Sequence, residues 1–285
     1  MEQLMEIGVA ASIMDEALRN AKSMAALDSY YLGLNCELLP VDRKSNAFKS
    51  ISLALKNTHA RTHNSYSLRL VDIYECKRAQ ETERYLEFLN STPLENRKLL
   101  WHGSRLTNWA GILKTGLRIA PPEAPVTGYM FGKGIYFADM VSKSSNYCFA
   151  DQKNPYGILV LSEVALGDPY HKLNAEESAA KNCKEKGCHH TWGIGGTLPD
   201  PSSQALLPSR FGGSLIPLHT GKGVSSKSVL EQIKMSGSSS LLYNEYIVYD
   251  EAQVTMRYIL RVEFNYKSFM EDDPSSSSSS DSDDD

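Results

Sequence analysis

The sequence predicts an α+β fold in which most strands are antiparallel. Apolar residues recur at helical spacing early in the chain, and short β-type runs bounded by Gly and Pro dominate the later part. Helices followed by strands favour a segregated α+β arrangement over alternating βαβ units. The 285 residues, 41% of them hydrophobic, suffice for a sizeable core.

The expected helices come first. Leu4, Ile7, Ala11, Met14, Leu18 and Ala21 share one helical face, which predicts an amphipathic helix that ends near Ala26. Residues 28–41 alternate loosely as far as Pro40, which predicts a strand. Helical spacing returns from Ser45 to Asn57.

The strands follow. Residues 67–78 alternate, and residues 98–104 form a short apolar strand that runs into a turn. Further β runs are GIYFAD (134–139), GILVLSEVALG (157–167), YNEYIVYD (243–250) and VTMRYILRVEFNY (254–266). Residues 174–240 are rich in Gly, Ser and Pro, so we expect a long irregular connection there.

The negative net charge comes from the C-terminal end. The chain has 30 basic and 34 acidic residues, but residues 271–285 contain seven acids and no base. The remainder therefore has 27 acids and a net charge of +3, which gives no electrostatic indication of nucleic-acid binding. Residues 270–285, rich in Ser and Asp, are expected to be disordered because they have little apolar surface to bury.

Cysteine use and hydropathy narrow the class of protein. Five scattered cysteines favour a reducing compartment. We recognise no signal peptide and no apolar run of the roughly 20 residues that span a bilayer. Cys183, Cys188, His189 and His190 are metal-binding types, but their spacing matches no common site, so no metal is expected. Glycines in GIGG (193–196) follow no apolar strand and do not form a dinucleotide fingerprint.

The strand that ends in His102, Gly103 and Ser104 is the first candidate site. Glycine at a strand end lets the backbone approach a ligand closely. Its N–H and C=O can then bind a carboxamide, whose oxygen also accepts from a serine hydroxyl. By itself, this segment is better explained as a strand that ends in a turn before a capped helix.

The glycine- and aromatic-rich segment 128–148 is the second candidate. Tyr136 and Tyr147 flank a Ser/Lys stretch, and two aromatic faces can clamp a flat ring. Each tyrosine alone is better explained as a core or rim residue.

Glu245 is the third candidate, because it interrupts an otherwise apolar and aromatic strand. A carboxylate there can stabilise an oxocarbenium-like state and activate a nucleophile. The alternative is a glutamate that faces solvent on an edge strand.

Together these blocks resemble the poly(ADP-ribose) polymerase family. The resemblance covers about residues 3–266 and is most specific in 99–148, with further blocks at 56–66, 161–168 and 241–250 in the family's order. It is strongest to the DNA-dependent nuclear members, the shorter ones in particular. It implies a split antiparallel sheet and transfer of ADP-ribose from NAD⁺ to protein acceptors, the chain itself included. It also implies polymer elongation, release of nicotinamide, a nuclear location and a role in DNA repair.

The resemblance also assigns roles to residues. It implies a His-Tyr-Glu triad of His102, Tyr136 and Glu245, with Glu245 as the catalytic carboxylate. Carboxamides that mimic nicotinamide are expected to compete with NAD⁺. The implied NAD⁺-binding residues are His102, Gly103, Ser104, Asn108, Arg118, Tyr129, Tyr136, Phe137, Ala138, Lys143, Ser144 and Tyr147. A mono-ADP-ribosyltransferase usually lacks the third glutamate, and a non-enzymatic module would have lost His102 or Glu245.

The domain organisation follows from the same resemblance. Residues 1–27 are expected to be the remaining helix of the family's regulatory helical domain, 28–269 the catalytic domain, and 270–285 the tail. DNA would bind only through modules outside this sequence, so activity is expected without DNA breaks.

Overall fold

The computed structural model describes residues 26–121, 123, 129–211 and 214–267, and also Gly8, Ala11, Ser12 and Asp15. Most of the expected N-terminal helix and the whole tail 270–285 lie outside the described residues. The four described positions within 8–15 are helical.

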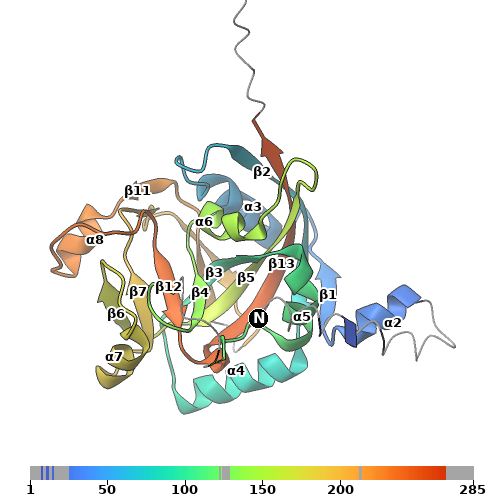
Figure 1. Ribbon diagram of the computed structural model, residues 1–285, viewed down its shortest axis with the longest axis horizontal. Helices are drawn as coiled ribbons and strands as arrows, with labels where there is room; N and C mark the ends of the chain where they lie inside the picture. Colours follow the sequence, from blue (N-terminus) through green and yellow to red (C-terminus); the bar gives the residue numbers. More distant parts are fainter. Residues whose placement is uncertain are drawn as a thin grey trace, which may run out of the picture.

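Two sheets organise the described chain (Figure 1). The larger, entirely antiparallel, has the order β1 (Glu37–Pro40), β2 (Tyr66–Lys77), β13 (Val254–Tyr266), β5 (Tyr156–Ala165) and β3 (Arg97–Ser104). The smaller has the order β4 (Ile135–Phe137), β12 (Glu245–Val248), β7 (His190–Gly193) and β6 (Pro169–Lys172), of which β6 and β7 are parallel. The predicted α+β, mostly antiparallel fold is confirmed.

Two further strand pairs and several short helices complete the fold. The pairs are β9 (Gln204–Pro208) with β10 (Leu215–His219), and β8 (Thr197–Pro199) with β11 (Gly223–Ser225). The helices are α2 (Ala26–Gly33), α3 (Asn46–Asn57), α4 (Ala79–Ser91), α5 (Trp109–Thr115), α6 (Val141–Ser145), α7 (Ala179–Glu185), α8 (Lys227–Gln232) and the 3₁₀ helices η1 (Leu106–Asn108), η2 (Asn146–Cys148) and η3 (Glu251–Gln253). In the described part of the chain, no helix is both long and apolar enough to cross a membrane.

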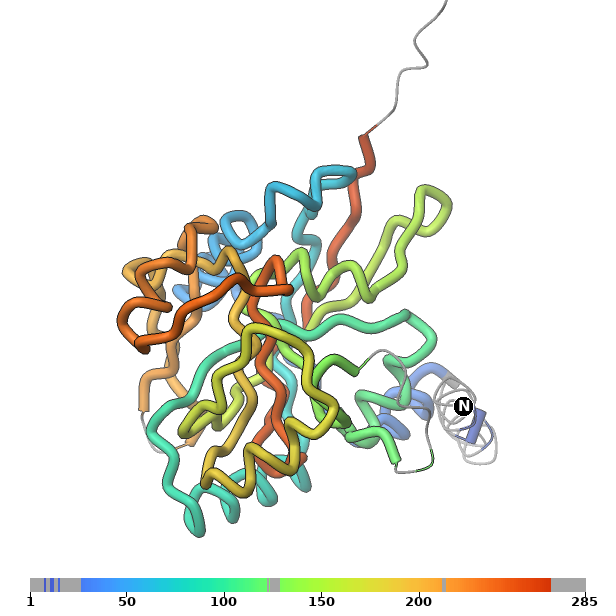
Figure 2. Tube along the Cα trace, turned by 60° about the vertical axis from the view of Figure 1, so that its left-hand side comes forward, coloured from blue at the N-terminus to red at the C-terminus, as the bar shows by residue number. Residues whose placement is uncertain are grey.

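The core lies on both faces of the larger sheet. Side chains alternate along a strand, so Leu99 and Trp101 of β3 face α3, whereas Leu100 faces α5 and the smaller sheet. Helix α3 is capped by Ser45, whose hydroxyl accepts a hydrogen bond from the Phe48 N–H at 3.1 Å. In Figures 1 and 2, β13 runs the height of the molecule, from the turn beside α4 to the upper edge.

Two expectations about secondary structure need correction. Residues 26–33 form helix α2, so the strand begins at Glu37 rather than at residue 28. The residues just before Ala26, where the preceding helix was expected to end, lie outside the described residues. The segment 174–240 is not an irregular connection, because it contains α7, α8 and five strands. Those strands are three to five residues long, too short for a periodicity signal. Helix α4 was not predicted at all.

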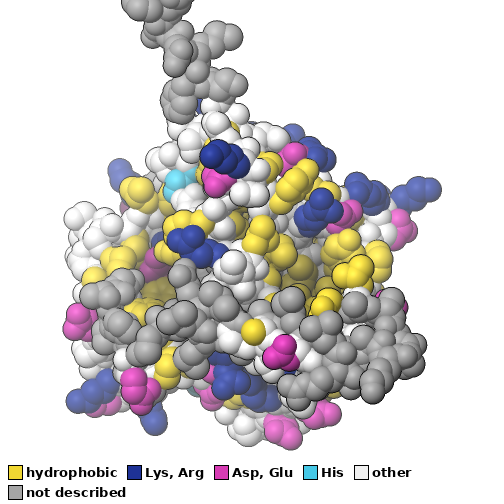
Figure 3. All heavy atoms as spheres, turned by 45° about the vertical axis from the view of Figure 1, so that its right-hand side comes forward, with side chains coloured by type: hydrophobic (Ala, Val, Ile, Leu, Met, Phe, Trp, Pro, Cys, Tyr) yellow, Lys and Arg dark blue, Asp and Glu magenta, His cyan; other side chains and the backbone are white. Residues whose placement is uncertain are grey.

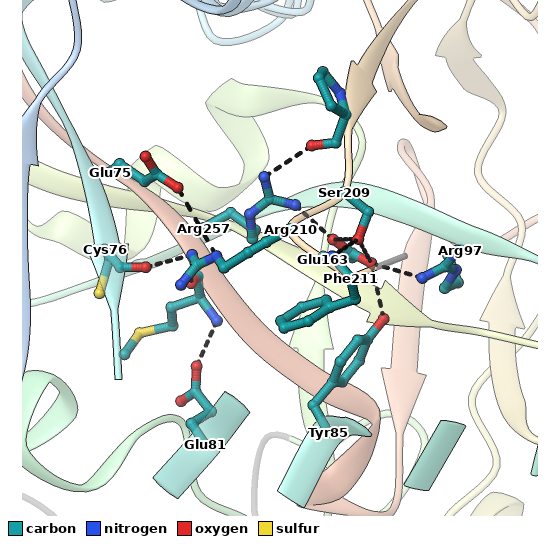
Figure 4. Close-up of polar contacts among 12 residues, drawn as sticks. Glu75, Cys76, Glu81, Tyr85, Arg97, Glu163, Ser209, Arg210, Phe211 and Arg257 are labelled. Atoms are coloured by element: carbon teal, nitrogen blue, oxygen red, sulfur yellow. Dashed lines mark hydrogen bonds and ion pairs between the residues drawn. The ribbon is translucent and has the colours of Figure 1, made fainter. Parts of the chain in front are cut away.

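A buried carboxylate holds the β9–β10 hairpin against the larger sheet (Figure 4). Glu163 of β5 is fully buried and pairs with Arg97 and Arg257. The Ser209 hydroxyl, just after β9, donates to both of its oxygens at 3.0 Å. This cluster is structural, since none of its members lines the cavity described next.

Candidate active site

One cavity of about 690 Å³ brings together all the residues that the resemblance selected. Its lining includes His102, Gly103, Ser104, Asn108, Arg118, Tyr129, Tyr136, Phe137, Ala138, Lys143, Ser144, Tyr147 and Glu245. Their grouping is an observation, and their individual roles stay predictions.

The cavity opens where β3 and β4 part. A two-way backbone contact joins them, with Trp101 N donating to Ala138 O at 2.8 Å and Ala138 N donating to Trp101 O at 3.0 Å. At the next position along the strands, the backbone contact is not repeated. Instead, the His102 ring hydrogen-bonds to the Tyr136 carbonyl, with an Nδ1–O distance of 2.9 Å. Backbone groups two residues apart on a strand point the same way. The N–H and C=O of Gly103 therefore face this parted edge rather than β5.

Gly103 is also required by packing. A Cβ at this position would lie 2.2 Å from the Ser144 carbonyl oxygen and 3.1 Å from a Leu159 methyl. Helix α6 therefore packs directly on the backbone of β3. Ser144 strengthens this contact, because its hydroxyl donates to Trp101 O at 2.9 Å. Any larger residue at 103 would push α6 away and reshape the cavity wall.

His102 is held neutral and in one tautomer. The Tyr136 carbonyl can only accept, so Nδ1 must carry the hydrogen and Nε2 presents a lone pair. Burial lowers the pKa of the His102 imidazole. The Phe137 ring contacts the imidazole edge at a centroid distance of 5.9 Å. A neutral ring fixed in this way can accept a hydrogen bond from a ligand hydroxyl.

Ser104 keeps its hydroxyl hydrogen available. Its oxygen accepts a hydrogen bond from Asn108 Nδ2 at 3.0 Å, so the hydroxyl can still donate. The Ser104 carbonyl accepts from the buried Trp109 indole at 3.1 Å, which fixes the turn from β3 into η1 and α5. The contacts with Asn108 and Trp109 thus orient the Ser104 hydroxyl before a ligand binds.

The tyrosines differ in how firmly they are held. The Tyr136 hydroxyl donates to Gly132 O at 2.6 Å and accepts from Phe131 N at 3.1 Å. Burial raises the pKa of Tyr136, so the phenol stays neutral. The Tyr129 ring packs against it at 5.9 Å. Tyr147 of η2 is 56% exposed, so its ring has room to adjust to a ligand.

Glu245 begins β12 and is buried at the cavity. Its Oε1 pairs with Lys143 Nζ at 2.9 Å, and Oε2 is buried without a hydrogen-bond partner among the described residues. Lys143 Nζ also donates to the Tyr243 carbonyl at 2.8 Å. Burial lowers the pKa of Lys143, and the Glu245 carboxylate opposes that shift. A buried oxygen left without a donor is costly, and a ligand hydroxyl would satisfy it.

Several lining residues were not predicted from the sequence, among them Arg105, Ile119 and Phe149. Arg105 lies over the Phe149 ring, with its guanidinium carbon 3.7 Å from the centroid, and both residues line the cavity. Ile119 lies in the wall beside Arg118. Arg105 directly follows His102-Gly103-Ser104, and that position was the available signal. Nothing in the sequence around Phe149 or Ile119 indicated a site.

The other motifs have structural roles. Among the described residues, no group of three or more His, Cys, Asp or Glu side chains could hold a metal ion. His190 is buried with Nδ1 2.8 Å from the Leu166 carbonyl, and Cys183 is buried in α7. In the GIGG segment, a Cβ at Gly195 would lie 2.3 Å from the Tyr243 backbone, so that glycine permits close packing.

Comparison with known proteins decides the family. Residues 45–264 match the poly(ADP-ribose) polymerase catalytic domain. The chain belongs to this family. It is 47% identical over 268 residues to poly(ADP-ribose) polymerase 1 of Gallus gallus, covering 94% of this chain and 24% of that protein. It is 48% identical to poly(ADP-ribose) polymerase of Drosophila melanogaster, covering 93% and 25% of the two chains, and 48% identical to poly(ADP-ribose) polymerase 2 of Arabidopsis thaliana, covering 84% and 34%.

These matches confirm the expected family, and they show which part of its members this chain corresponds to. The chain spans about a quarter to a third of the length of these relatives. The matched residues contain the whole of the cavity lining, from His102 to Glu245. The polymerase catalytic domain is therefore the part of those proteins that this chain shares.

Proposed function

We propose that this chain transfers ADP-ribose from NAD⁺ to protein acceptors, itself included, and extends it into poly(ADP-ribose) with release of nicotinamide. The observation that carries the proposal is Glu245. It is a buried carboxylate with one oxygen held by Lys143 and the other without a partner among the described residues, in the same cavity as the parted edge of β3.

The nicotinamide end of NAD⁺ fits the parted edge of β3. The Gly103 C=O would accept from the carboxamide NH₂, and the Gly103 N–H and Ser104 hydroxyl would donate to the carboxamide oxygen. Tyr136 and Tyr147 would contact the two faces of the pyridine ring. Because this recognition needs only a carboxamide on a flat ring, benzamide-type compounds should compete with NAD⁺.

The adenosine end fits the part of the cavity beyond His102. The Nε2 lone pair of His102 would accept from a ribose hydroxyl. Arg118 offers a cation for the diphosphate, and Asn108 and Tyr129 lie in the same lining. Lys143 and Ser144 would border the nicotinamide side, with Phe137 and Ala138 forming the floor between the two ends.

The reaction follows from the position of Glu245. The bond between C1′ of the ribose and the pyridinium nitrogen breaks, and its electron pair leaves with neutral nicotinamide. The resulting oxocarbenium-like charge is stabilised by the Glu245 carboxylate, whose Oε2 also accepts from a ribose hydroxyl. An acceptor oxygen then bonds to C1′, and its proton passes to the Glu245 carboxylate, which acts as the general base. Lys143 holds the carboxylate in place.

Labelled NAD⁺ followed by gel electrophoresis tests the proposal. The wild-type chain should produce a ladder or smear of polymer. Glu245→Gln should bind NAD⁺ but lose polymer formation by about 10²–10⁴-fold, because the amide hydrogen-bonds without stabilising positive charge. Glu263→Gln, at an ion pair with Arg69 outside the cavity lining, is the matched control and should behave as wild type.

The outcomes separate the rival functions. A single discrete band from wild type would mean mono-ADP-ribosylation, and no label with intact NAD⁺ binding would mean a binding module. Elongation by Glu245→Gln at the wild-type rate would remove Glu245 from the catalytic role.

A nuclear location and a part in DNA repair are the cellular setting that we propose, supported by the resemblance to the DNA-dependent polymerases. On the face drawn in Figure 3, basic and acidic side chains of the described residues are interspersed rather than gathered by sign. That distribution supports no direct DNA-binding surface on this face. We therefore propose that DNA acts through parts of the protein other than this domain.

A further inference from the structure

Glu251 ties one wall of the cavity to the rest of the fold. It opens η3, the turn between β12 and β13, which lies beside α4 in Figure 1. Its Oε1 accepts from Ile119 N at 3.0 Å, and its Oε2 lies 3.2 Å from Arg118 Nε. Arg84 of α4 completes the group, with Nη1 3.6 Å from Oε2 and Nη2 donating to the Glu251 carbonyl at 3.2 Å.

These contacts support the cavity wall from outside the cavity. Arg118 and Ile119 line the cavity, whereas Glu251 and Arg84 do not. The Arg118 side chain is 61% exposed and would sample many rotamers without a partner. The ion pair through Nε holds the guanidinium beside Glu251 at the cavity wall. Planar, paired donors of this kind match the oxygens of a phosphate.

The charges of the group favour an anion. Arg84 and Arg118 contribute two positive charges and Glu251 one negative charge, so the group keeps a net positive charge at the wall. Glu251 therefore orients Arg118 without cancelling its attraction for an anionic ligand. Its carboxylate is shared with Arg84 and the Ile119 N–H, so it does not bind Arg118 alone.

The same wall has a second support from the N-terminal end of α4. Arg78, the residue before α4, donates to the Lys114 carbonyl at 2.7 Å and pairs with Glu81. Glu81 in turn accepts from Met256 N of β13 at 2.6 Å. Helix α4 thus connects the segment from Lys114 to Ile119 with the central strand, so Glu251 acts on a wall whose other end is already anchored.

We propose that Glu251 is a positioning residue that presents Arg118 to the diphosphate of NAD⁺, while its bond to the Ile119 N–H fixes the wall beside Arg118. The inference rests on the proposed function, since NAD⁺ supplies the anion. It predicts that Glu251 governs affinity for the ADP-ribose part of the substrate and has no effect on the nicotinamide part.

Separate titrations of two fragments test this. We expect Glu251→Ala to weaken ADP-ribose binding by roughly three- to tenfold. The reason is that the ligand must then order the Arg118 side chain itself, at the entropic cost of one immobilised side chain. KM for NAD⁺ should rise by the same factor with kcat within about twofold. Benzamide affinity should not change. Glu251→Gln keeps one of the two acceptor oxygens and should fall between wild type and Glu251→Ala.

The controls separate this inference from others. Glu263→Ala, which also removes a glutamate from an ion pair, should leave both titrations unchanged. ADP-ribose binding by Glu251→Ala that is unchanged or tighter would overturn the inference, as would an equal loss of benzamide affinity. If wild type binds neither fragment, the proposed function itself fails. If wild type binds both and Glu251→Ala matches it, only the positioning role fails.

Discussion

Replacing Glu163 by Gln should destabilise the protein by removing the anion from a buried cluster. The Arg257 guanidinium donates to Glu163 at 2.6 Å and the Arg97 guanidinium at 3.1 Å (Figure 4). The Ser209 hydroxyl donates at 3.0 Å and the Tyr85 hydroxyl at 3.2 Å. Gln has almost the same shape, so the change removes charge while leaving little cavity.

The magnitude follows from burial. The two arginine side chains are 4% and 12% exposed and the glutamate 0%. Removing one partner of a buried ion pair costs about 3–5 kcal/mol, because the remaining charge stays buried without compensation. The amide oxygen of Gln still accepts hydrogen bonds, so we expect the lower end, about 3 kcal/mol. At roughly 2–4 °C per kcal/mol for a domain of this size, the melting temperature should fall by about 6–12 °C.

Urea unfolding, followed by circular dichroism at neutral pH, measures this loss. The midpoint should fall while the m-value stays constant, since the unfolded surface is the same. Glu263→Gln is the control, because Arg69, its partner, is 56% exposed and such pairs contribute about 0–1 kcal/mol. A loss below about 1 kcal/mol for Glu163→Gln would refute the view that this cluster holds the hairpin to the sheet.

Two other positions give predictions of different kinds. In Gly103→Ala, the new Cβ would lie 2.2 Å from Ser144 O, so α6 must move. Calorimetry should show benzamide affinity reduced at least about tenfold, and unchanged affinity in a folded variant would contradict the packing argument. Burial lowers the pKa of His190 to about 3, against about 6.5 when unfolded. The unfolded chain then binds the proton that the folded chain excludes, so the unfolding free energy should fall as pH drops from about 6.5 toward 3. His190→Gln should flatten the pH dependence of the urea midpoint in that window, and an equal slope in both proteins would argue against a buried neutral imidazole.

The bounds of helices and strands could be predicted from the sequence where the apolar residues recur with a strong periodicity. Helix α3 and strands β2, β3 and β13 lie within a residue or two of the expected bounds, because their own side chains alternate or repeat. The helix at Ala26–Gly33 and the short strands of 174–240 were missed. Those strands are defined by partners elsewhere in the chain, such as Thr197 opposite Ser225. No window of local sequence contains that pairing.

Glu245 and Glu163, two glutamates in apolar strands, show that local sequence also cannot assign the role of a buried carboxylate. The sequence singled out Glu245 as a carboxylate that needs a purpose, and the same reasoning applies to Glu163 in β5. The structure separates them. Glu245 has an oxygen without a partner among the described residues at the cavity, whereas Glu163 accepts from four donors, which come from β3, β13, α4 and the residue after β9. Burial of a carboxylate can thus indicate either a site or a structural cluster, and the partners decide which.

The sequence by itself determined the α+β class, the family and many of the residues that line the cavity, because these depend on residue type and order along the chain. Only the tertiary structure decided how β3 parts from β4 at Gly103, which oxygen of Glu245 has no partner among the described residues, and that Glu251 holds Arg118 and Ile119 from outside the cavity. Glu251 lies 132 residues from Ile119, and Glu81 lies 175 residues from Met256. Contacts over such separations are set by how the two sheets and α4 pack together, and local sequence carries no signal of them.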